Sequence, residues 1–353
     1  MEKNLINCNF FMKILLIHFK LLGDTIFLLP AIKAIKERYP VAQIHLLIPQ
    51  EFIDVFYGQE DISKIWAFPR IRGKINLKES LPIVFSLMSQ KFDISLDMVG
   101  NDRGAILSAL IFSRNRYGPV GPKRDLLKRI SYTKIYEKSN LRLPWTQWYL
   151  DLSSHFFGSS SLYVPFSLFL SDFNKIAAKK ILGKSNVIFH IGSSQEKKEW
   201  PLSSWYELYC LCKSRNLKPI FSSGISSREK SYLKKLIQMD SSIKVLPCIV
   251  NLSKFMAVLN ASSLVVSSDT APLHLAFGLK VKVIGLFGPR ESKRTASGIY
   301  GNSEKIVARK CVCDGDLQKL NFCMNKKSCM GSISVISVFE KITNILNRSV
   351  SVK

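Results

Sequence analysis

Continuous apolar runs alternate with helix-period stretches in the first half of the chain. An apolar run at 13–18 is followed by a Gly-containing turn at 21–24, a helix-period stretch over 25–38 and a second apolar run at 43–48. Strand, tight turn, helix and parallel strand make a βαβ unit, and a fully apolar strand indicates a sheet covered on both faces. The pattern recurs with a run at 92–97 and a helix-period stretch over 103–112.

The second half repeats this alternation. It predicts strands at 186–191, 218–222, 264–267 and 281–286, helices over 205–215, over 227–239 and from 271, and an amphipathic helix over 332–347. Alternation in both halves predicts two facing, doubly wound, Rossmann-like α/β domains. The Ser/Phe-rich stretch 157–173 lacks a helical period and is interpreted as the link. We therefore expect an N-terminal domain over 1–172, a C-terminal domain over 173–335 and a C-terminal helix over 336–353.

Composition adds one property to the predicted fold, which is a strongly basic net charge. The 353 residues are 47% hydrophobic and 22% charged, which excludes fibrous and disordered classes. The net charge of +25 favours a negatively charged partner and leaves nucleic acid, an anionic membrane surface and phosphorylated small molecules open. The basic stretch 117–138 is either a solvated surface or a landing surface for an anionic acceptor.

The apolar runs are short. A membrane-spanning helix needs about 18 uninterrupted apolar residues, whereas the longest candidate, 14–32, carries charged side chains and is broken by Gly23 and Pro30. No small-residue cleavage site of a signal peptide follows the N-terminal run. We expect a cytoplasmic protein that touches a membrane without crossing it.

Candidate chemistry lies at the predicted strand ends, where open α/β sheets bind ligands. Asp24, after the first strand, is either a helix cap or a base that accepts a proton from a hydroxyl. The segment 267–276 opens a helix whose N–H groups and dipole form an anion site, with Thr270 as a hydroxyl donor and Ser268 or Asp269 as the alternative cap. Neither G-x-G-x-x-G nor a P-loop occurs, so the usual indication of a dinucleotide oxidoreductase or a P-loop NTPase is missing.

Two further strand ends offer small residues that let a backbone approach a ligand closely. The segment 190–194 (His-Ile-Gly-Ser-Ser) is followed by a lysine pair at 197–198, which offers a point charge to a diphosphate or is simply solvated. The segment 285–290 (Gly-Leu-Phe-Gly-Pro-Arg) is the other Gly/Pro turn of this kind.

Taken together, these segments resemble glycosyltransferase family 9, the heptosyltransferases of lipopolysaccharide core assembly. The resemblance runs in order along nearly the whole chain, and its most specific piece is Ser-Asp-Thr-Ala-Pro-Leu-His-Leu-Ala at 268–276. It implies a GT-B fold, with an anionic lipopolysaccharide core acceptor bound by the N-terminal domain and an ADP-sugar by the C-terminal domain. It also implies that the enzyme works peripherally at the inner face of the inner membrane.

The resemblance also implies site residues. Asp24 would be the general base, Lys198 would bind donor phosphate or stabilise the leaving group, Thr270 would contact the diphosphate and Asp269 the donor sugar. The other implied donor-binding residues are Ser193, Ser194, Gly224, Ser268, Ala271, His274 and Gly288. The implied acceptor-binding residues are Asp97, Asn101 and Arg103. An inverting transfer with these groups needs no metal ion.

Two features suggest a metal nonetheless. Cys311, Cys313, Cys323 and Cys329 could hold zinc or iron through thiolates, although the C-x-C spacing is unusual for a zinc knuckle and structural thiols are the alternative. Asp314-Gly-Asp316 matches the D-x-D of metal-dependent GT-A transferases, but it lies between cysteines late in the chain, without a nucleotide domain ahead of it in the order that GT-A transferases have.

Three functional hypotheses follow. The first is transfer of heptose from ADP-heptose to Kdo-lipid A or the heptosylated core. The second keeps the fold and donor but modifies serines of a surface or autotransporter protein, as the cysteine-bearing tail suggests by resemblance. The third is a non-catalytic nucleic-acid-binding protein, which rests on charge alone, since no RRM, KH or zinc-finger pattern occurs. We expect no nucleic-acid partner.

Overall fold

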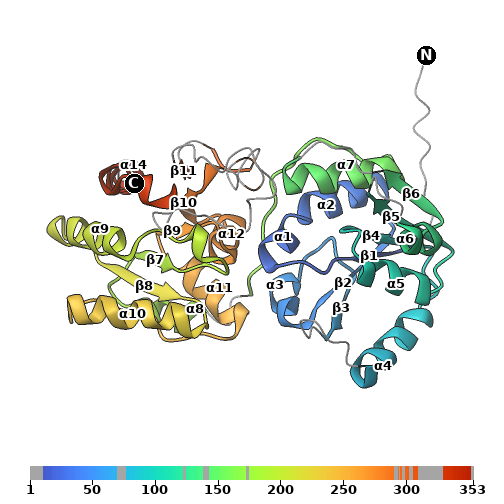
Figure 1. Cartoon of the computed structure of the whole chain (residues 1–353), viewed down its shortest axis with the longest axis horizontal. Helices are drawn as coiled ribbons and strands as arrows, with labels where there is room; N and C mark the ends of the chain where they lie inside the picture. Colours follow the sequence, from blue (N-terminus) through green and yellow to red (C-terminus); the bar gives the residue numbers. More distant parts are fainter. Residues whose placement is uncertain are drawn as a thin grey trace, which may run out of the picture. The chain divides into compact units, whose positions relative to one another are not determined.

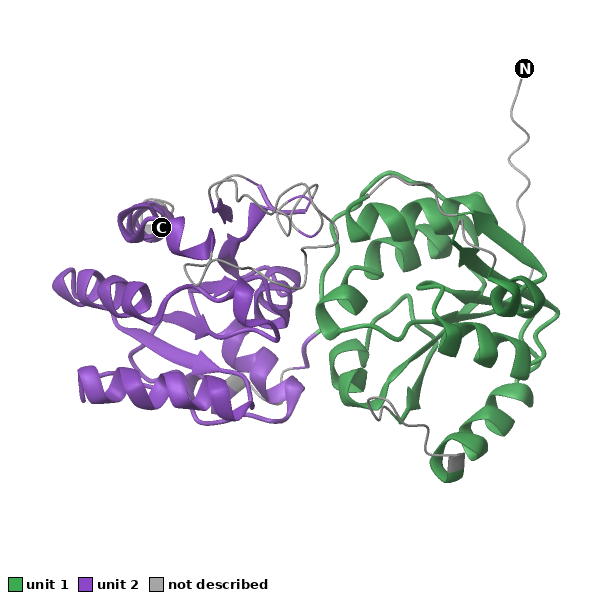
Figure 2. Ribbon diagram, in the orientation of Figure 1, with its two compact units in different colours: residues 1–169 green, residues 170–353 purple. Residues whose placement is uncertain are grey.

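The computed structural model divides the chain into two compact units. It describes residues 11–69, 77–121, 125–137, 143–171, 175–289, 293, 295, 299–301, 305–308 and 329–350. Unit 1 comprises residues 1–169 and unit 2 residues 170–353 (Figure 2). The division falls within the Ser/Phe-rich stretch at 157–173.

Unit 1 is built on a six-stranded, wholly parallel sheet with the order β3-β2-β1-β4-β5-β6 (Figure 1). Its strands are β1 (Lys13–Ile17), β2 (Gln43–Pro49), β3 (Lys64–Phe68), β4 (Ile94–Asp97), β5 (Asn115–Val120) and β6 (Lys134–Glu137). The buried residues of β1 and β2 are almost all apolar, as a sheet covered on both faces requires.

Helices cover both faces of this sheet. They are α1 (Leu22–Ile26), α2 (Leu29–Arg38), the short turn η1 (Gln50–Phe52) with α3 (Ile53–Phe56), α4 (Leu77–Met88), α5 (Asp102–Leu110), α6 (Leu126–Ser131) and α7 (Trp145–Phe157). The prediction of a single helix over 25–38 is wrong, because a second helix begins at Leu29 with Pro30 in its first turn. Proline has no N–H to donate to residue 26 and its ring clashes with that carbonyl.

Unit 2 holds a five-stranded, wholly parallel sheet with the order β11-β10-β9-β7-β8. Its strands are β7 (Val187–Ile191), β8 (Pro219–Ser223), β9 (Leu264–Ser268), β10 (Lys282–Phe287) and β11 (Lys305–Val307). Its helices are α8 (Lys175–Leu182), η3 (Glu196–Lys198), α9 (Leu202–Ser214), α10 (Ser227–Met239), α11 (Leu252–Asn260), α12 (Ala271–Gly278), η6 (Cys329–Ser332) and α14 (Val335–Val350).

The C-terminal helix α14 is part of the core of unit 2. Val338 and Ile342 are buried in the same apolar cluster as Phe189 of β7 and Trp205 of α9. Trp200 Nε1 donates to the carbonyl of Ile333, 3.2 Å away, and connects the segment just before α14 to the segment between η3 and α9. Removal of α14 would therefore expose the core rather than trim an appendage.

Both sheets contain a point at which the strand order reverses. In unit 1 it lies between β1 and β4, and in unit 2 between β7 and β9. Ligands of open α/β sheets bind outside the carboxyl ends of the strands at such points, because the loops there turn in opposite directions and leave a crevice. The fold thus points to four loops as candidate binding loops: those after β1, β4, β7 and β9.

Candidate active site

Asp24 lies in the first turn of α1, shortly after β1. The N-cap of α1 is Leu21, whose side chain makes no capping hydrogen bond, and Asp24 is the third helical residue. The interpretation of Asp24 as the helix cap is therefore wrong. Its carboxylate is only partly buried, near a helix N-terminus whose dipole favours a negative charge.

A buried chain of hydrogen bonds fixes the backbone beside Asp24. The ring of His18, which is fully buried, lies with Nδ1 3.0 Å from Thr25 Oγ1 and Nε2 2.9 Å from the Tyr149 hydroxyl of α7. Thr25 Oγ1 also donates to the carbonyl of Leu21. His18 and Tyr149 were not predicted as site residues from the sequence, where the position of His18 at the end of an apolar strand is the only signal for it.

The predicted acceptor residues follow β4. Asp97 is buried, and its Oδ1 accepts hydrogen bonds from the N–H groups of Val99 and Gly100 at 2.8 and 3.0 Å. Its Oδ2 accepts from the Tyr132 hydroxyl at 2.7 Å. Burial, together with the charge of Asp97, raises the pKa of Tyr132 far above its usual value and keeps that hydroxyl a donor. Asp97 therefore holds the loop after β4 in shape.

Two other residues of this loop have different surroundings. Asn101 is the N-cap of α5, and its Oδ1 accepts from the N–H of Gly104 at 2.8 Å. Arg103 is partly exposed, with its guanidinium carbon 5.8 Å from the centre of the Phe19 ring. Of the three predicted acceptor residues, Arg103 is thus the one that carries a positive charge, and it is partly exposed.

In unit 2 the loops after β7 and β9 bring two predicted site residues together. Lys198 Nζ, at the end of η3, lies 2.6 Å from Oδ2 of Asp269, which directly follows β9. Of the two side chains, that of Lys198 is 22% exposed and that of Asp269 only 4%. His274 Nε2 lies 3.3 Å from the other oxygen of Asp269, and His274 Nδ1 lies 2.6 Å from the Tyr300 hydroxyl.

The ionised state of Asp269 follows from this arrangement. Burial by itself raises the pKa of the carboxyl, but the neighbouring His274 and the charge of Lys198 outweigh burial and hold the pKa below its usual value. Asp269 is thus a buried anion that aligns the lysine, whose own ammonium stays accessible.

The helix α12 starts immediately after this ion pair. Its N-cap is Thr270, which makes no side-chain capping hydrogen bond, so the prediction that Ser268 or Asp269 caps the helix is wrong. Thr270 and Ala271 are partly exposed, whereas Ser268 is fully buried and its hydroxyl has no hydrogen-bond partner within the described part of the chain. Main-chain N–H groups uncapped by a side chain, next to a lysine, can bind an anion.

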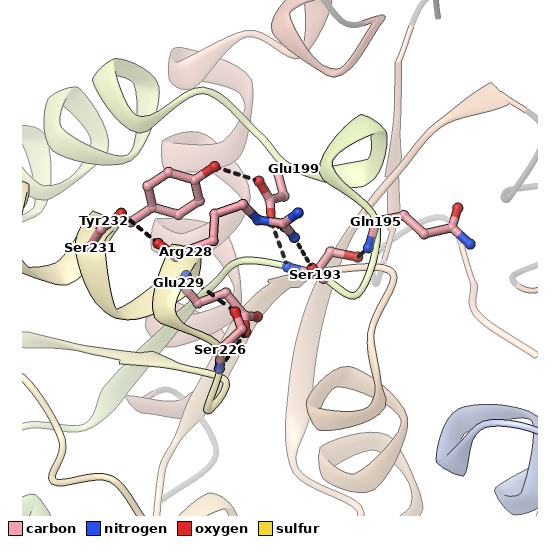
Figure 3. Close-up of polar contacts among 8 residues, drawn as sticks. All are labelled: Ser193, Gln195, Glu199, Ser226, Arg228, Glu229, Ser231 and Tyr232. Carbon is pink, nitrogen blue, oxygen red and sulfur yellow. Dashed lines mark hydrogen bonds and ion pairs between the residues drawn. The ribbon is translucent and has the colours of Figure 1, made fainter. Parts of the chain in front are cut away.

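The loop after β7 is held by Glu199 (Figure 3). Glu199 Oε1 accepts from the N–H of Ser193 at 3.0 Å and from Arg228 at 2.8 Å, while Oε2 accepts from the Tyr232 hydroxyl at 3.0 Å. Arg228 also donates to the carbonyl of Ser193, at 2.5 Å. The main-chain N–H and C=O of Ser193 are therefore both hydrogen-bonded to side chains of the protein.

The hydrogen bonds that Glu199 and Arg228 make with Ser193 distinguish the two predicted donor-binding serines. Ser193 is buried, and its hydroxyl accepts from the N–H of Gln195 at 3.3 Å. Ser194 is exposed. Ser193 therefore shapes the loop, and Ser194 is the residue that can reach a ligand. Sequence reasoning missed Glu199, Arg228 and Tyr232, because the residues of this cluster come from segments separated by about thirty positions.

The predicted glycines at this site lie against protein atoms. Gly192 has a φ of +94°, a left-handed conformation that glycine adopts without strain, and a Cβ there would collide with Glu229 of α10. A Cβ on Gly224, after β8, would collide with the same carboxylate. Gly288 is buried directly after β10. Gly192 and Gly224 thus let their loops approach α10 closely.

Replacing Glu199 by Gln tests the role of this cluster. The variant removes the negative charge that pairs with Arg228 and weakens the hydrogen bond to Ser193. We therefore expect the free energy of unfolding to fall by about 2 kcal/mol, which is less than for a fully buried pair because Arg228 is partly exposed. Urea denaturation measures this change. Glu196→Gln, in the same turn but exposed, is the matched control and should leave stability unchanged. Equal stability of the two variants would contradict the role given to Glu199.

The metal prediction falls mainly on residues that the structure does not describe. Cys311, Cys313 and Cys323 lie outside the described residues, as does the Asp314-Gly-Asp316 segment. Cys329 is partly buried and is the first residue of η6. In the described ranges, no three side chains of His, Cys, Asp or Glu come together in an arrangement suited to a metal ion.

Comparison with known sequences gives one family. The family model described as glycosyltransferase family 9 (heptosyltransferase) matches residues 83–326. Lipopolysaccharide heptosyltransferase 1 of Campylobacter coli is 26% identical over 336 residues, covering 89% of this chain and 95% of that protein. The lipopolysaccharide core heptosyltransferase OpsX of Haemophilus influenzae is 24% identical, covering 81% of each.

Solved structures agree in fold. A glycosyltransferase family 9 structure from Veillonella parvula superposes with a TM-score of 0.77 at 16% identity, covering 96% of this chain and 98% of that one. Escherichia coli heptosyltransferase WaaC with ADP gives 0.71 at 18%, covering 95% and 100%. The iron-containing dodecameric glycosyltransferase TibC of Escherichia coli gives 0.60 at 12%, covering 96% and 76%. These matches confirm the predicted GT-B class.

Proposed function

Because the chain belongs to glycosyltransferase family 9 and is therefore an enzyme of glycosyl transfer, we propose that it moves a heptose from ADP-heptose to the inner core of lipopolysaccharide. The acceptor is Kdo-lipid A or a core that already carries heptose. The transfer inverts the configuration at the anomeric carbon.

The observation that carries the donor half of this proposal is the ion pair of Lys198 and Asp269 beside the start of α12. It lies at the point of strand reversal in unit 2, where a nucleotide diphosphate fits the general geometry of open α/β sheets. The Lys198 ammonium offers a charge and the N–H groups at the start of α12 offer donors to the phosphate oxygens. Thr270 and Ser194 add hydroxyl donors at the same edge.

The proposed reaction is a direct displacement. The acceptor hydroxyl attacks the anomeric carbon, the bond from that carbon to the phosphate oxygen of ADP breaks, and Asp24 takes the hydroxyl proton. Negative charge builds up on the departing ADP, where Lys198 and the α12 N–H groups stabilise it. In this scheme the protein supplies all the positive charge that the leaving group needs, and no metal ion takes part.

Asp269 has two proposed tasks. It holds Lys198 in place through the 2.6 Å contact, and it accepts a hydrogen bond from a sugar hydroxyl of the donor. His274, on the first turns of α12, orients Asp269 from the other side. The remaining proposed donor contacts are made by Ala271, Gly224 and Gly288, whose small size allows the ligand to approach the backbone.

The acceptor is proposed to bind unit 1 near Arg103, whose guanidinium suits the anionic inner core. Within the described residues no helix has both the length and the apolar character needed to cross a membrane. Since the acceptor is anchored in lipid, we place the enzyme at the cytoplasmic face of the inner membrane.

The two alternative functions, nucleic-acid binding and modification of a surface protein, have less support. The non-catalytic nucleic-acid-binding hypothesis conflicts with membership of an enzyme family. Modification of a surface protein depends on the cysteine-bearing tail, three of whose cysteines lie outside the described residues. The relatives with sequence similarity given above are named for lipopolysaccharide, which favours the lipid-anchored acceptor.

A two-step experiment tests the proposal. Thermal denaturation with ADP-, UDP- and GDP-sugars identifies the donor, because a ligand that binds only the folded state stabilises it by about 2.7 kcal/mol at a hundredfold excess over Kd. ADP-heptose should give the largest shift. Incubation with ADP-heptose and Kdo-lipid A, or heptosylated core, should then release ADP and add one heptose to the lipid. A shift only with another nucleotide sugar, or heptose found on polypeptide and not on lipid, would overturn the proposal.

A further inference from the structure

Three helices of unit 1 share one face of the sheet. The chain crosses the sheet in one direction from β1 to β3, then returns past β1 to β4 and continues in the other direction to β6. Because such connections are right-handed, α4, α5 and α6 lie together on the face opposite α2, against which α7 packs. α5 packs against both α4 and α6, and α2 packs against α7 (Figure 1). The outer surface of α4, α5 and α6 is called the α4–α6 face below.

The helix α6 turns its apolar side chains outward. Leu126, Leu127 and Ile130 are 70%, 43% and 70% exposed, whereas Ser131 in the same helix is buried. A surface helix of a folded domain normally has the opposite arrangement, with its apolar stripe toward the core. Packing within unit 1 therefore does not explain the apolar residues of α6.

The neighbouring helices continue this apolar surface. Ile106 and Leu110 of α5 are exposed at positions i and i+4, which lie on one side of a helix, and Leu81 and Phe85 of α4 are exposed at the same spacing. Phe112, just after α5, is 73% exposed. Single exposed apolar side chains need no explanation, but seven of them on three adjoining helices, with Phe112 beside them in sequence, mark an interaction surface.

Basic residues accompany the apolar ones. The sequence from 103 to 138 contains nine Lys or Arg residues and two Asp or Glu residues. Arg114, which follows α5 in the chain, and Lys134, which follows α6, are exposed, as is Arg129 of α6, which pairs with the exposed Glu137 at 3.2 Å. Apolar side chains with basic residues around them are the composition by which proteins bind the interface of an anionic bilayer.

We propose that the α4–α6 face docks on an anionic lipid bilayer, with the apolar side chains inserted among the acyl chains and the basic residues against the lipid phosphates. The inference rests on the proposed function, in which the acceptor is anchored in lipid, and it names the surface that holds the enzyme there. A second copy of the chain is a poor occupant, because each copy carries a net charge of +25 and the two basic faces repel.

Vesicle sedimentation without donor or acceptor tests this surface independently of activity. The probes are vesicles of phosphatidylethanolamine with phosphatidylglycerol and vesicles of phosphatidylcholine alone. The unaltered chain should bind the anionic vesicles and dissociate with added salt. The double variant Leu126→Asp with Ile130→Asp should bind them at least about tenfold more weakly, since it replaces inserted side chains by charges that the bilayer repels. Thermal denaturation should show the variant folded, because both side chains are exposed.

The matched control is Ile176→Asp with Val250→Asp, two equally exposed apolar residues of unit 2, and it should bind like the unaltered chain. Equal binding by the α6 double variant, or no binding of the unaltered chain to anionic vesicles, would overturn the inference. So would a self-association in sedimentation velocity that the α6 variant abolishes, since that result assigns the face to a second copy. Vesicle binding together with failed heptose transfer would instead reject the proposed function and leave the docking surface standing.

Discussion

Asp24→Asn is expected to lower kcat by about a thousandfold, because the amide keeps the size of the side chain but cannot take the proton from the acceptor hydroxyl. The affinity for ADP should change little, since Asp24 lies in unit 1 and the proposed diphosphate contacts lie in unit 2. Single-turnover transfer measures the first quantity and isothermal titration with ADP the second.

Asp54→Asn is the control for this experiment. Asp54 is also an acidic residue in the first turn of a short helix that follows a strand of unit 1, and it is exposed. The Asp54 variant should transfer heptose at the unaltered rate. If Asp24→Asn kept its kcat within tenfold of the unaltered enzyme, another group would have to be the base.

The second large effect is expected for Lys198→Met. This variant removes the charge proposed to stabilise departing ADP, so kcat/KM should fall by about a hundredfold to a thousandfold. ADP should also bind more weakly, which separates this variant from Asp24→Asn. Exposed Lys213, paired with Asp240 at 2.9 Å in the same unit, offers the matched control Lys213→Met, which should leave transfer unchanged.

Lys198→Met also has a stability effect with a defined pH dependence. The pKa of Asp269 is held below its usual value by His274 and Lys198, so its ionised form stabilises the folded state at pH values above the unfolded-state pKa of about 3.9. Removing Lys198 weakens that contribution. The difference in unfolding free energy between Lys198→Met and the unaltered chain should therefore be largest at neutral pH and shrink as the pH falls below about 4. A difference that grows on acidification would contradict this account of Asp269.

Local patterns predicted much of the architecture. Continuous apolar strands, the helix periods between them and the Gly-containing turns were sufficient to predict parallel α/β units, and the comparisons confirmed the GT-B class and the family. The break between α1 and α2 was missed because the apolar period continues through it, although Pro30 was visible. Strand β6 was missed for a different reason, since Lys134 and Glu137 at its ends are exposed and give an edge strand little apolar signal.

The candidate site was predicted by position along the chain but not by role. The family resemblance singled out Lys198 and Asp269, yet their contact depends on two loops seventy-one positions apart meeting at the reversal of the sheet. Asp97 shows what the sequence could not predict. The sequence places a carboxylate at the end of a strand, but only the structure shows that this carboxylate accepts hydrogen bonds from Tyr132 and from two backbone N–H groups.

The sequence by itself determined the alternation of strands and helices in both halves, the basic charge and the strand-end positions of the polar residues, because these depend on the residues themselves and on neighbours a few positions away. Only the tertiary structure decided that Glu199 and Arg228 form hydrogen bonds with the main-chain N–H and C=O of Ser193, and that the leucines of α6 are exposed. Both depend on which segments pack together. Packing is a property of the whole unit, because a side chain is buried or exposed according to neighbours that are distant in the chain.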